Sequence, residues 1–172
     1  ESNPYVKAVR VSRQYPSTLS IEIVEREPIA MLNIDPILML DRDGIILPDQ
    51  GKSDDFLIPC LSGFNPAKEL YPSGQQTVSV KVQETMGLIT RIIDAYPSLY
   101  NNISEVTLNA NDEYVIILAD YPTKVILGNN DIWSKIEILG KFENSLQNKR
   151  QLSDYNYLDL RYTNQVIAKE RV

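Results

Sequence analysis

The sequence of 172 residues contains no histidine and only one cysteine, Cys60. Without histidine, the chain cannot form serine–histidine or cysteine–histidine nucleophile pairs, histidine-ligated zinc sites or an imidazole general base. One cysteine cannot form an internal disulfide or a multi-cysteine metal site. The composition therefore favours a non-enzymatic protein that needs no cofactor.

The sequence also lacks clustered Lys and Arg and has no long apolar run. Its 17 basic and 23 acidic residues give a net charge of −6, and no basic stripe is present to contact phosphates. Nucleic acid is therefore not an expected partner. A membrane-spanning helix needs about 20 consecutive apolar residues, and no such stretch occurs. Because the chain begins at Glu1 and not at methionine, we expect it to be part of a longer protein.

Residues 5–25 alternate apolar and polar side chains, which predicts a β-hairpin. The alternation breaks at 15–17, where Pro16 favours a turn. Pro28 removes a ladder donor and restricts the residue before it, so a domain boundary is predicted near this position. The apolar face of the hairpin consists of Val9, Val11, Leu19, Ile21 and Ile23.

Residues 37–47 predict a second, tighter hairpin. Two short apolar runs flank Asp41, Arg42, Asp43 and Gly44, a sequence typical of a turn. The following residues, 49–72, are rich in Pro, Gly, Ser and Asp and are expected to be mostly loop.

Two segments show helical periodicity. Residues 80–96 place apolar side chains on one face and are followed by Pro97, so a helix is predicted to end there. A second helix is predicted after Asn130, which can act as its N-cap. The expected buried stripes are Val82, Met86, Ile89, Ile93 and Tyr96 in the first helix, and Ile132, Ile136, Leu139, Phe142 and Leu146 in the second.

The remaining apolar runs predict strands separated by turn residues. The fold class expected is α+β: a hairpin followed by a mixed α/β domain, with an antiparallel-rich sheet and two main helices packed on it. The strand-like runs lie at 103–108, 114–118, 124–127, 157–162 and 166–169, the last two forming a hairpin.

Several short motifs, in order along nearly the whole chain, resemble the FtsQ/DivIB family of bacterial cell-division proteins. Each motif is weak alone, but their order and spacing together are specific. They are residues 3–7 (NPYVK), 15–19 (YPSTL), 25–30 (EREPIA), 40–44 (LDRDG) with 47–48 (LP), 58–59 (IP) with 61–63 (LSG), 125–128 (VILG) and 157–162 (YLDLRY).

This resemblance implies a parent protein with a cytoplasmic tail, one transmembrane helix, a POTRA domain and a larger mixed α/β domain. On this basis residues 1–28 are the C-terminal hairpin of the POTRA domain, and residues 29–172 are the FtsQ/DivIB-type β domain. The parent is expected in the cell inner membrane, with this part of the chain on the periplasmic or extracytoplasmic side, at the division septum. The implied role is non-enzymatic assembly of the divisome.

The implied partners are the membrane-anchored division proteins FtsB and FtsL. A terminal strand commonly leaves one edge of a sheet unpaired, so we expect a partner strand to add beside residues 166–172. Tyr162 matches a family position implicated in partner contact, whereas Asn129 stands where relatives often carry an arginine that contacts an acidic partner residue. The predicted partner-binding residues are Tyr162, Asn164, Gln165, Val166, Ile167, Ala168, Lys169 and Asn129.

The sequence leaves two other function classes open. One is a POTRA-bearing outer-membrane assembly or chaperone-like factor that binds unfolded strands. The other is a hydrolase in which Asp41 and Asp43 hold a metal, although a turn explains these residues more simply. Asp159 and Arg161, two residues apart, are expected to form a structural ion pair.

Overall fold

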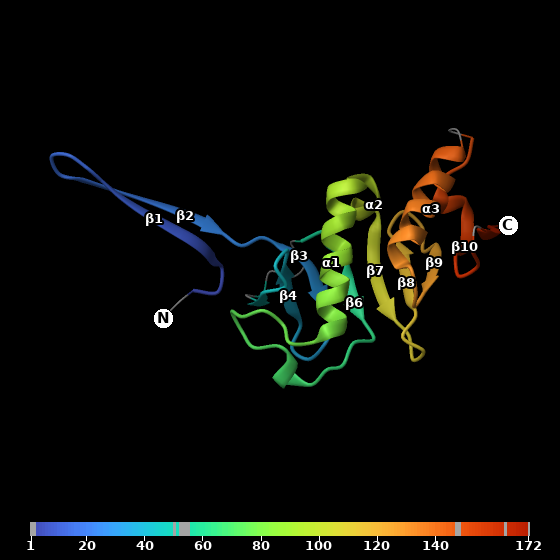
Figure 1. Ribbon diagram of the computed structural model, residues 1–172, viewed down its shortest axis with the longest axis horizontal. Coiled ribbons are helices and arrows are strands. Elements are labelled where there is room, and N and C mark those ends of the chain that lie inside the picture. Colours follow the sequence, from blue (N-terminus) through green and yellow to red (C-terminus); the bar gives the residue numbers. More distant parts are fainter. Residues whose placement is uncertain (1–2, 50, 52–55, 147–148, 164, 172) are drawn as a thin grey trace.

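The computed structural model describes residues 3–49, 51, 56–146, 149–163 and 165–171. The chain forms a two-stranded hairpin and a separate nine-stranded sheet that carries helices (Figure 1). The hairpin projects away from the larger sheet, and the C-terminal strands lie at the opposite end of the molecule (Figure 1). This arrangement confirms the predicted α+β class.

The hairpin consists of β1 (Val6–Gln14) and β2 (Thr18–Glu25). Val9 lies opposite Ile23 and Val11 lies opposite Ile21, so the predicted alternation is confirmed. These side chains are more than half exposed. An isolated two-stranded hairpin is marginal in water, and this one presents an open apolar face among the described residues.

The larger sheet has the order β11-β10-β9-β8-β7-β6-β3-β4-β5. Its pairings are antiparallel except for β9–β10, β3–β6 and β6–β7, which are parallel. The sheet is therefore rich in antiparallel pairs, as the sequence indicated. Its strands are β3 (Pro28–Leu32), β4 (Leu38–Asp41), β5 (Ile46–Pro48), β6 (Cys60–Ser62), β7 (Ile103–Leu108), β8 (Tyr114–Leu118), β9 (Lys124–Gly128), β10 (Tyr155–Asp159) and β11 (Ile167–Glu170).

Helical crossovers join two of the parallel pairs, since consecutive parallel strands need a long connection, which is usually a helix. Helix α1 (Val80–Ala95) and the short α2 (Pro97–Asn101) connect β6 to β7, and α3 (Ile132–Ser145) connects β9 to β10. Helices α1 and α3 lie on the same face of the sheet (Figure 1). Their buried residues pack with those of β7, β8 and β9 into one core, which contains Val82, Met86, Ile89, Ile136, Leu139, Val106, Ile116, Val125 and Leu127.

The structure corrects three expectations. Strand β6 lies inside the segment expected to be mostly loop, where it pairs with β3 and β7. Pro97 begins α2 as well as ending α1, because proline suits the first position of a helix. Asp131, not Asn130, is the N-cap residue of α3, and its side chain makes no capping hydrogen bond. The side chain of Asn130 instead accepts a hydrogen bond from Lys135.

The turn after β4 also attaches the hairpin to the larger sheet. Asp41 is buried, and its Oδ1 accepts hydrogen bonds from the backbone N–H groups of Asp43 and Ile45, both at 2.9 Å. Gly44 follows at φ 71°, a conformation that glycine adopts without strain. The predicted turn is therefore confirmed, and Oδ2 of Asp41 remains free to pair with Arg26 at 2.5 Å.

Two further contacts hold the base of the hairpin. The Tyr5 hydroxyl donates to the carbonyl oxygen of Pro48 at 2.7 Å, and Lys7 pairs with Asp43 at 2.9 Å. The Lys7–Asp43 pair is about half exposed and contributes little. The Arg26–Asp41 pair is mostly buried, with side chains 18% and 4% exposed, so it is the main polar attachment.

We predict that Asp41→Ala lowers the free energy of unfolding by about 3 kcal/mol, because it leaves Arg26 and two N–H groups without their buried acceptor. Urea unfolding measures this loss. Asp94→Asn is the matched control, since the Arg42–Asp94 pair is largely exposed and its loss should cost less than about 1 kcal/mol. Equal losses in the two variants contradict the importance given to the buried pair.

Candidate functional site

The two edges of the nine-stranded sheet differ in accessibility. At the β5 edge, the backbone of residues 73–77 lies alongside and is hydrogen-bonded to the strand. Ile46 donates to the carbonyl of Gln75 at 2.9 Å, Gly74 donates to the carbonyl of Ile46 at 2.8 Å, and Thr77 donates to that of Gly44 at 2.9 Å. This segment closes the β5 edge against another strand.

The β11 edge is open within the part of the chain that the structure describes. Strand β11 pairs only with β10, and all four of its residues are exposed. The N–H of Arg171 donates to the carbonyl of Asp154 at 2.8 Å. Because ladder groups alternate in direction along an antiparallel strand, the N–H groups of Ile167 and Lys169 point toward β10, whereas those of Ala168 and Glu170 point outward.

The predicted partner-binding residues occupy two neighbouring regions. Ile167, Ala168 and Lys169 belong to β11, and Gln165 and Val166 lead into it. At the other region, Tyr162 and Asn129 are exposed in the loops that follow β10 and β9. Asn164 lies outside the described residues.

A small cavity of about 190 Å³ lies beside Tyr162, between the start of α3 and the loop after β10. Tyr162 is 52% exposed, so its ring borders the cavity without filling it. Lys135 and Arg161 contribute the cationic side chains of the lining, and Asp131 contributes a carboxylate.

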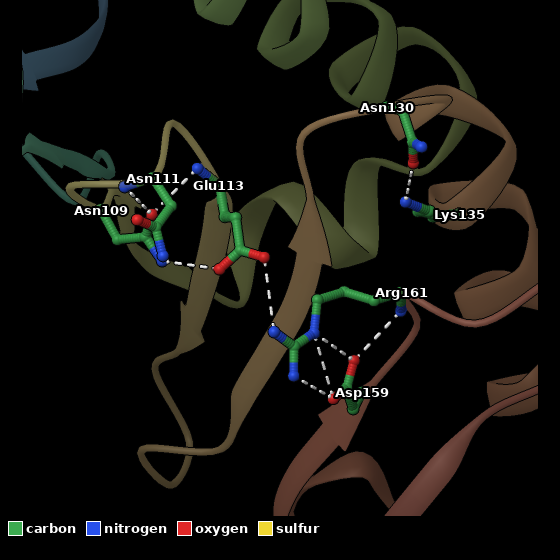
Figure 2. Close-up of polar contacts among 7 residues, drawn as sticks. All are labelled: Asn109, Asn111, Glu113, Asn130, Lys135, Asp159 and Arg161. Carbon is green, nitrogen blue, oxygen red and sulfur yellow. Dashed lines mark hydrogen bonds and ion pairs between the residues drawn. The ribbon is translucent and has the colours of Figure 1, made fainter.

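Arg161 is held in a network that the sequence showed only in part (Figure 2). The predicted pair with Asp159 is confirmed, with Nη2 to Oδ2 at 2.7 Å and Nε to Oδ1 at 3.0 Å. Arg161 Nη1 also reaches Glu113 Oε1 at 3.3 Å, and Glu113 accepts from Asn109 at 2.8 Å. The network therefore ties the residue before Tyr162 to the β7–β8 turn.

Lys135 and Gly128 lie next to Arg161. The ammonium group of Lys135 donates to Asn130 Oδ1 at 2.7 Å (Figure 2), and burial lowers the pKa of Lys135. Gly128 has φ 78°, and a Cβ at this position would lie 3.1 Å from Arg161 Cγ and 3.4 Å from Lys135 Nζ. A side chain at 128 would therefore crowd the Arg161 stem and would have to adopt a backbone conformation that favours glycine.

The carboxylates that suggested a metal site are occupied by the protein's own cations. Arg26 pairs with Asp41, and Lys7 pairs with Asp43. The hydrogen bond from Lys7 lowers the pKa of Asp43. Among the described residues, no three His, Cys, Asp or Glu side chains are grouped for metal binding. Asp41 and Asp43 thus serve the turn and the hairpin attachment.

In the same described part of the chain, no helix is long and apolar enough to span a membrane.

These features define a mixed α/β domain, preceded by a hairpin, whose β11 edge is accessible within the described ranges. A family model described as FtsQ/DivIB, C-terminal related, matches residues 38–169, and a model described as POTRA domain, FtsQ-type, matches residues 1–26. The chain belongs to the FtsQ/DivIB family.

Curated relatives named "Cell division protein FtsQ" align with almost the whole chain. The protein of Geotalea daltonii is 28% identical over 98% of this chain and 60% of its own length. The protein of Syntrophotalea carbinolica is 25% identical over 98% of this chain and 58% of its own length. The protein of Geobacter sp. strain M21 is 27% identical over 98% of this chain and 60% of its own length. The chain therefore spans about three fifths of the length of these relatives.

The Arg161 network predicts a loss of stability in acid. Hydrogen bonds from Arg161 lower the pKa of Asp159, and hydrogen bonds from Asn109 and Arg161 lower that of Glu113. Because the folded-state pKa values lie below the unfolded ones, the stabilisation is present above the unfolded pKa and is lost as the pH falls through the folded pKa. We expect the free energy of unfolding to fall below about pH 5, and Asp159→Asn to reduce that fall.

Urea unfolding at a series of pH values measures this effect. Asp120→Asn is the control, because Asp120 is an exposed carboxylate in the loop after β8. The control should keep the pH dependence of the parent protein. If Asp159→Asn and the parent lose stability equally between about pH 5 and pH 2, the network does not contribute as described.

Proposed function

We propose that this chain is the extracytoplasmic part of a non-enzymatic divisome assembly protein, and that it binds a membrane-anchored partner of the FtsB or FtsL type by strand addition along β11. The observation that carries the proposal is the contrast between the two sheet edges. Residues 73–77 cover the β5 edge, whereas β11 is exposed at every residue. An exposed edge is a template for an added strand, whose backbone hydrogen bonds provide affinity.

The proposed binding surface extends from β11 to the cavity beside Tyr162. Backbone groups of Ala168 and Glu170 face outward and can pair with an incoming strand. A partner segment that continues past the start of β11 reaches Tyr162, an exposed aromatic side chain of a type that often anchors interfaces. Arg161 and Lys135 supply the cations beside this loop, where Asn129 carries no charge.

The family match also supports a division of the chain into two domains. We propose that residues 1–28 are the C-terminal hairpin of a POTRA domain and residues 29–172 the FtsQ/DivIB-type β domain. The open apolar face of the hairpin then belongs to a domain completed by other residues of the parent protein. On the same grounds we propose that the parent lies in the cell inner membrane, with this region on the extracytoplasmic side at the septum.

The edge is tested by a proline at Ala168. We expect Ala168→Pro to weaken partner binding at least about tenfold, because proline removes an outward N–H that the added strand requires. Ala168→Val is the matched control, since it keeps that N–H. Isothermal titration with the extracytoplasmic domain of the FtsB-type partner from the same organism measures the affinity, and circular dichroism confirms folding. A folded Ala168→Pro variant with unchanged affinity contradicts strand addition at β11.

The aromatic anchor is tested separately. Tyr162→Ala should weaken binding of the same partner by about 1 kcal/mol or more, because it removes the exposed aromatic side chain that borders the cavity between α3 and the loop after β10. Tyr15→Ala is the control: Tyr15 is 92% exposed and lies at the tip of the hairpin, far from β11 (Figure 1). Equal affinities of the two variants place Tyr162 outside the interface.

A further inference from the structure

The register of the sheet aligns two lysines with a tyrosine at the open edge. Tyr157 of β10 lies opposite Lys169 of β11 on one side and opposite Lys124 of β9 on the other. Residues directly opposite in a sheet point to the same face. That face is the one opposite α1 and α3, because Val125, the residue after Lys124 in β9, points to the other face and is buried in the helix-covered core.

Neither lysine has an acidic partner among the described residues. Lys124 and Lys169 are exposed, and no ion pair joins either of them to a carboxylate in that part of the chain. These two cations share one row of the sheet in a chain whose net charge is −6. They create a local positive potential beside the edge that is proposed to accept a strand.

The guanidinium of Arg171 extends this positive region past the C-terminal end of β11. Arg171 lies over the Tyr121 ring at 5.3 Å and donates to the carbonyls of Ser153 and Tyr155 at 3.3 Å and 3.2 Å, so it is fixed by neutral groups. Arg150 is paired with Glu170. A pocket of about 560 Å³ beside these side chains is lined by Lys149, Arg150 and Arg171 and also by the carboxylates Asp154 and Glu170. The end of β11 thus offers space, with one more cationic than anionic side chain around it.

We propose that the strand added at β11 is acidic, with a carboxylate side chain opposite Lys169 and an apolar side chain opposite Ile167, on the same face. This inference rests on the proposed strand addition and specifies the chemistry of the segment that binds there. If the added strand is antiparallel, Lys169 and the residue opposite it form a non-hydrogen-bonded pair, because the backbone groups of Lys169 point toward β10. In such a pair the two side chains lie closer together than in a hydrogen-bonded pair. A glutamate opposite Lys169 then forms a cross-strand ion pair, while Lys124 adds longer-range attraction.

Apolar contact on the same face supports the second half of the proposal. Ile167 is 42% exposed and lies opposite Asp159, which is already neutralised by Arg161. An apolar side chain beside Ile167 is buried against it at no electrostatic cost. This face of the sheet therefore favours a partner strand in which an acidic residue and an apolar residue lie two positions apart, so that both point to this face.

The test uses two synthetic strand peptides titrated into the nitrogen-15-labelled chain, the glutamate peptide repeating Glu-Thr-Val-Thr and the lysine peptide repeating Lys-Thr-Val-Thr, so that the charged residue and valine alternate on one face of the strand. We expect the glutamate peptide to shift the amide resonances of Ala168 and Glu170, and the lysine peptide to shift neither at equal concentration. The affinity should fall as salt is raised, because exposed ion pairs are screened. The double variant Lys124→Glu with Lys169→Glu should reverse the preference between the peptides.

Two control variants separate the possible results. Lys68→Glu changes the net charge by the same amount as one edge substitution but lies in a different part of the fold, so it should keep the preference of the parent. Ala168→Pro should abolish binding of the glutamate peptide. If binding survives Ala168→Pro, strand addition fails even though the charge attraction remains. If Ala168→Pro abolishes partner binding but the two peptides bind equally, only the acidic character of the strand is wrong.

Three further outcomes overturn the inference. One is that neither peptide shifts the β11 resonances. Another is that vesicles containing phosphatidylglycerol shift the same resonances and displace the glutamate peptide, since the positive region then serves an anionic membrane surface. The third is binding of the glutamate peptide that is insensitive to the double charge reversal, which contradicts the pairing with Lys169.

Discussion

A nine-stranded sheet has two ends, and the backbone groups at each end must find partners in the protein, in water or in another chain. In this chain the two ends are treated differently. The segment 73–77 runs beside β5 and takes up its outward N–H and carbonyl groups. At the other end β11 is short and exposed, and among the described residues its outward groups have no further strand beside them. The function proposed for the chain depends on this difference.

The rest of the fold supports the open edge. Helix α3 connects β9 to β10 and so places β10 in parallel beside β9, which leaves the outer position of the sheet to β11. The Arg161 network then joins the end of β10 to the β7–β8 turn through Asp159 and Glu113. The loop that carries Tyr162 therefore leaves the sheet from a fixed point. At the far end, the buried Arg26–Asp41 pair fixes the base of the hairpin.

Local sequence patterns predicted most of the elements. The helical period of residues 80–96 and the short apolar runs of β7, β8 and β9 were sufficient, because each of these elements buries one face against the same core. Strand β6 could not be recognised in the same way. It has only three residues in a segment rich in Pro, Gly and Ser, and its strand conformation comes from pairing with β3 and β7, which are distant in sequence.

The candidate site was predicted in part for similar reasons. The Asp159–Arg161 pair is local in sequence and was expected, whereas Glu113 lies 48 residues from Arg161 and carries no pattern of its own. Asn130 has the side chain of a typical N-cap residue. Its Oδ1 instead accepts a hydrogen bond from the buried ammonium group of Lys135, which requires an acceptor. The row of Lys124, Tyr157 and Lys169 is visible only in the sheet register.

Amide hydrogen exchange on β11, with and without the FtsB-type partner, tests the central claim most directly. In the free chain, the N–H groups of Ile167 and Lys169 should be protected by β10, whereas those of Ala168 and Glu170 should exchange rapidly. Binding of the partner should slow exchange at Ala168 and Glu170 specifically. Unchanged exchange at these two amides in a saturated complex would contradict strand addition at the open edge.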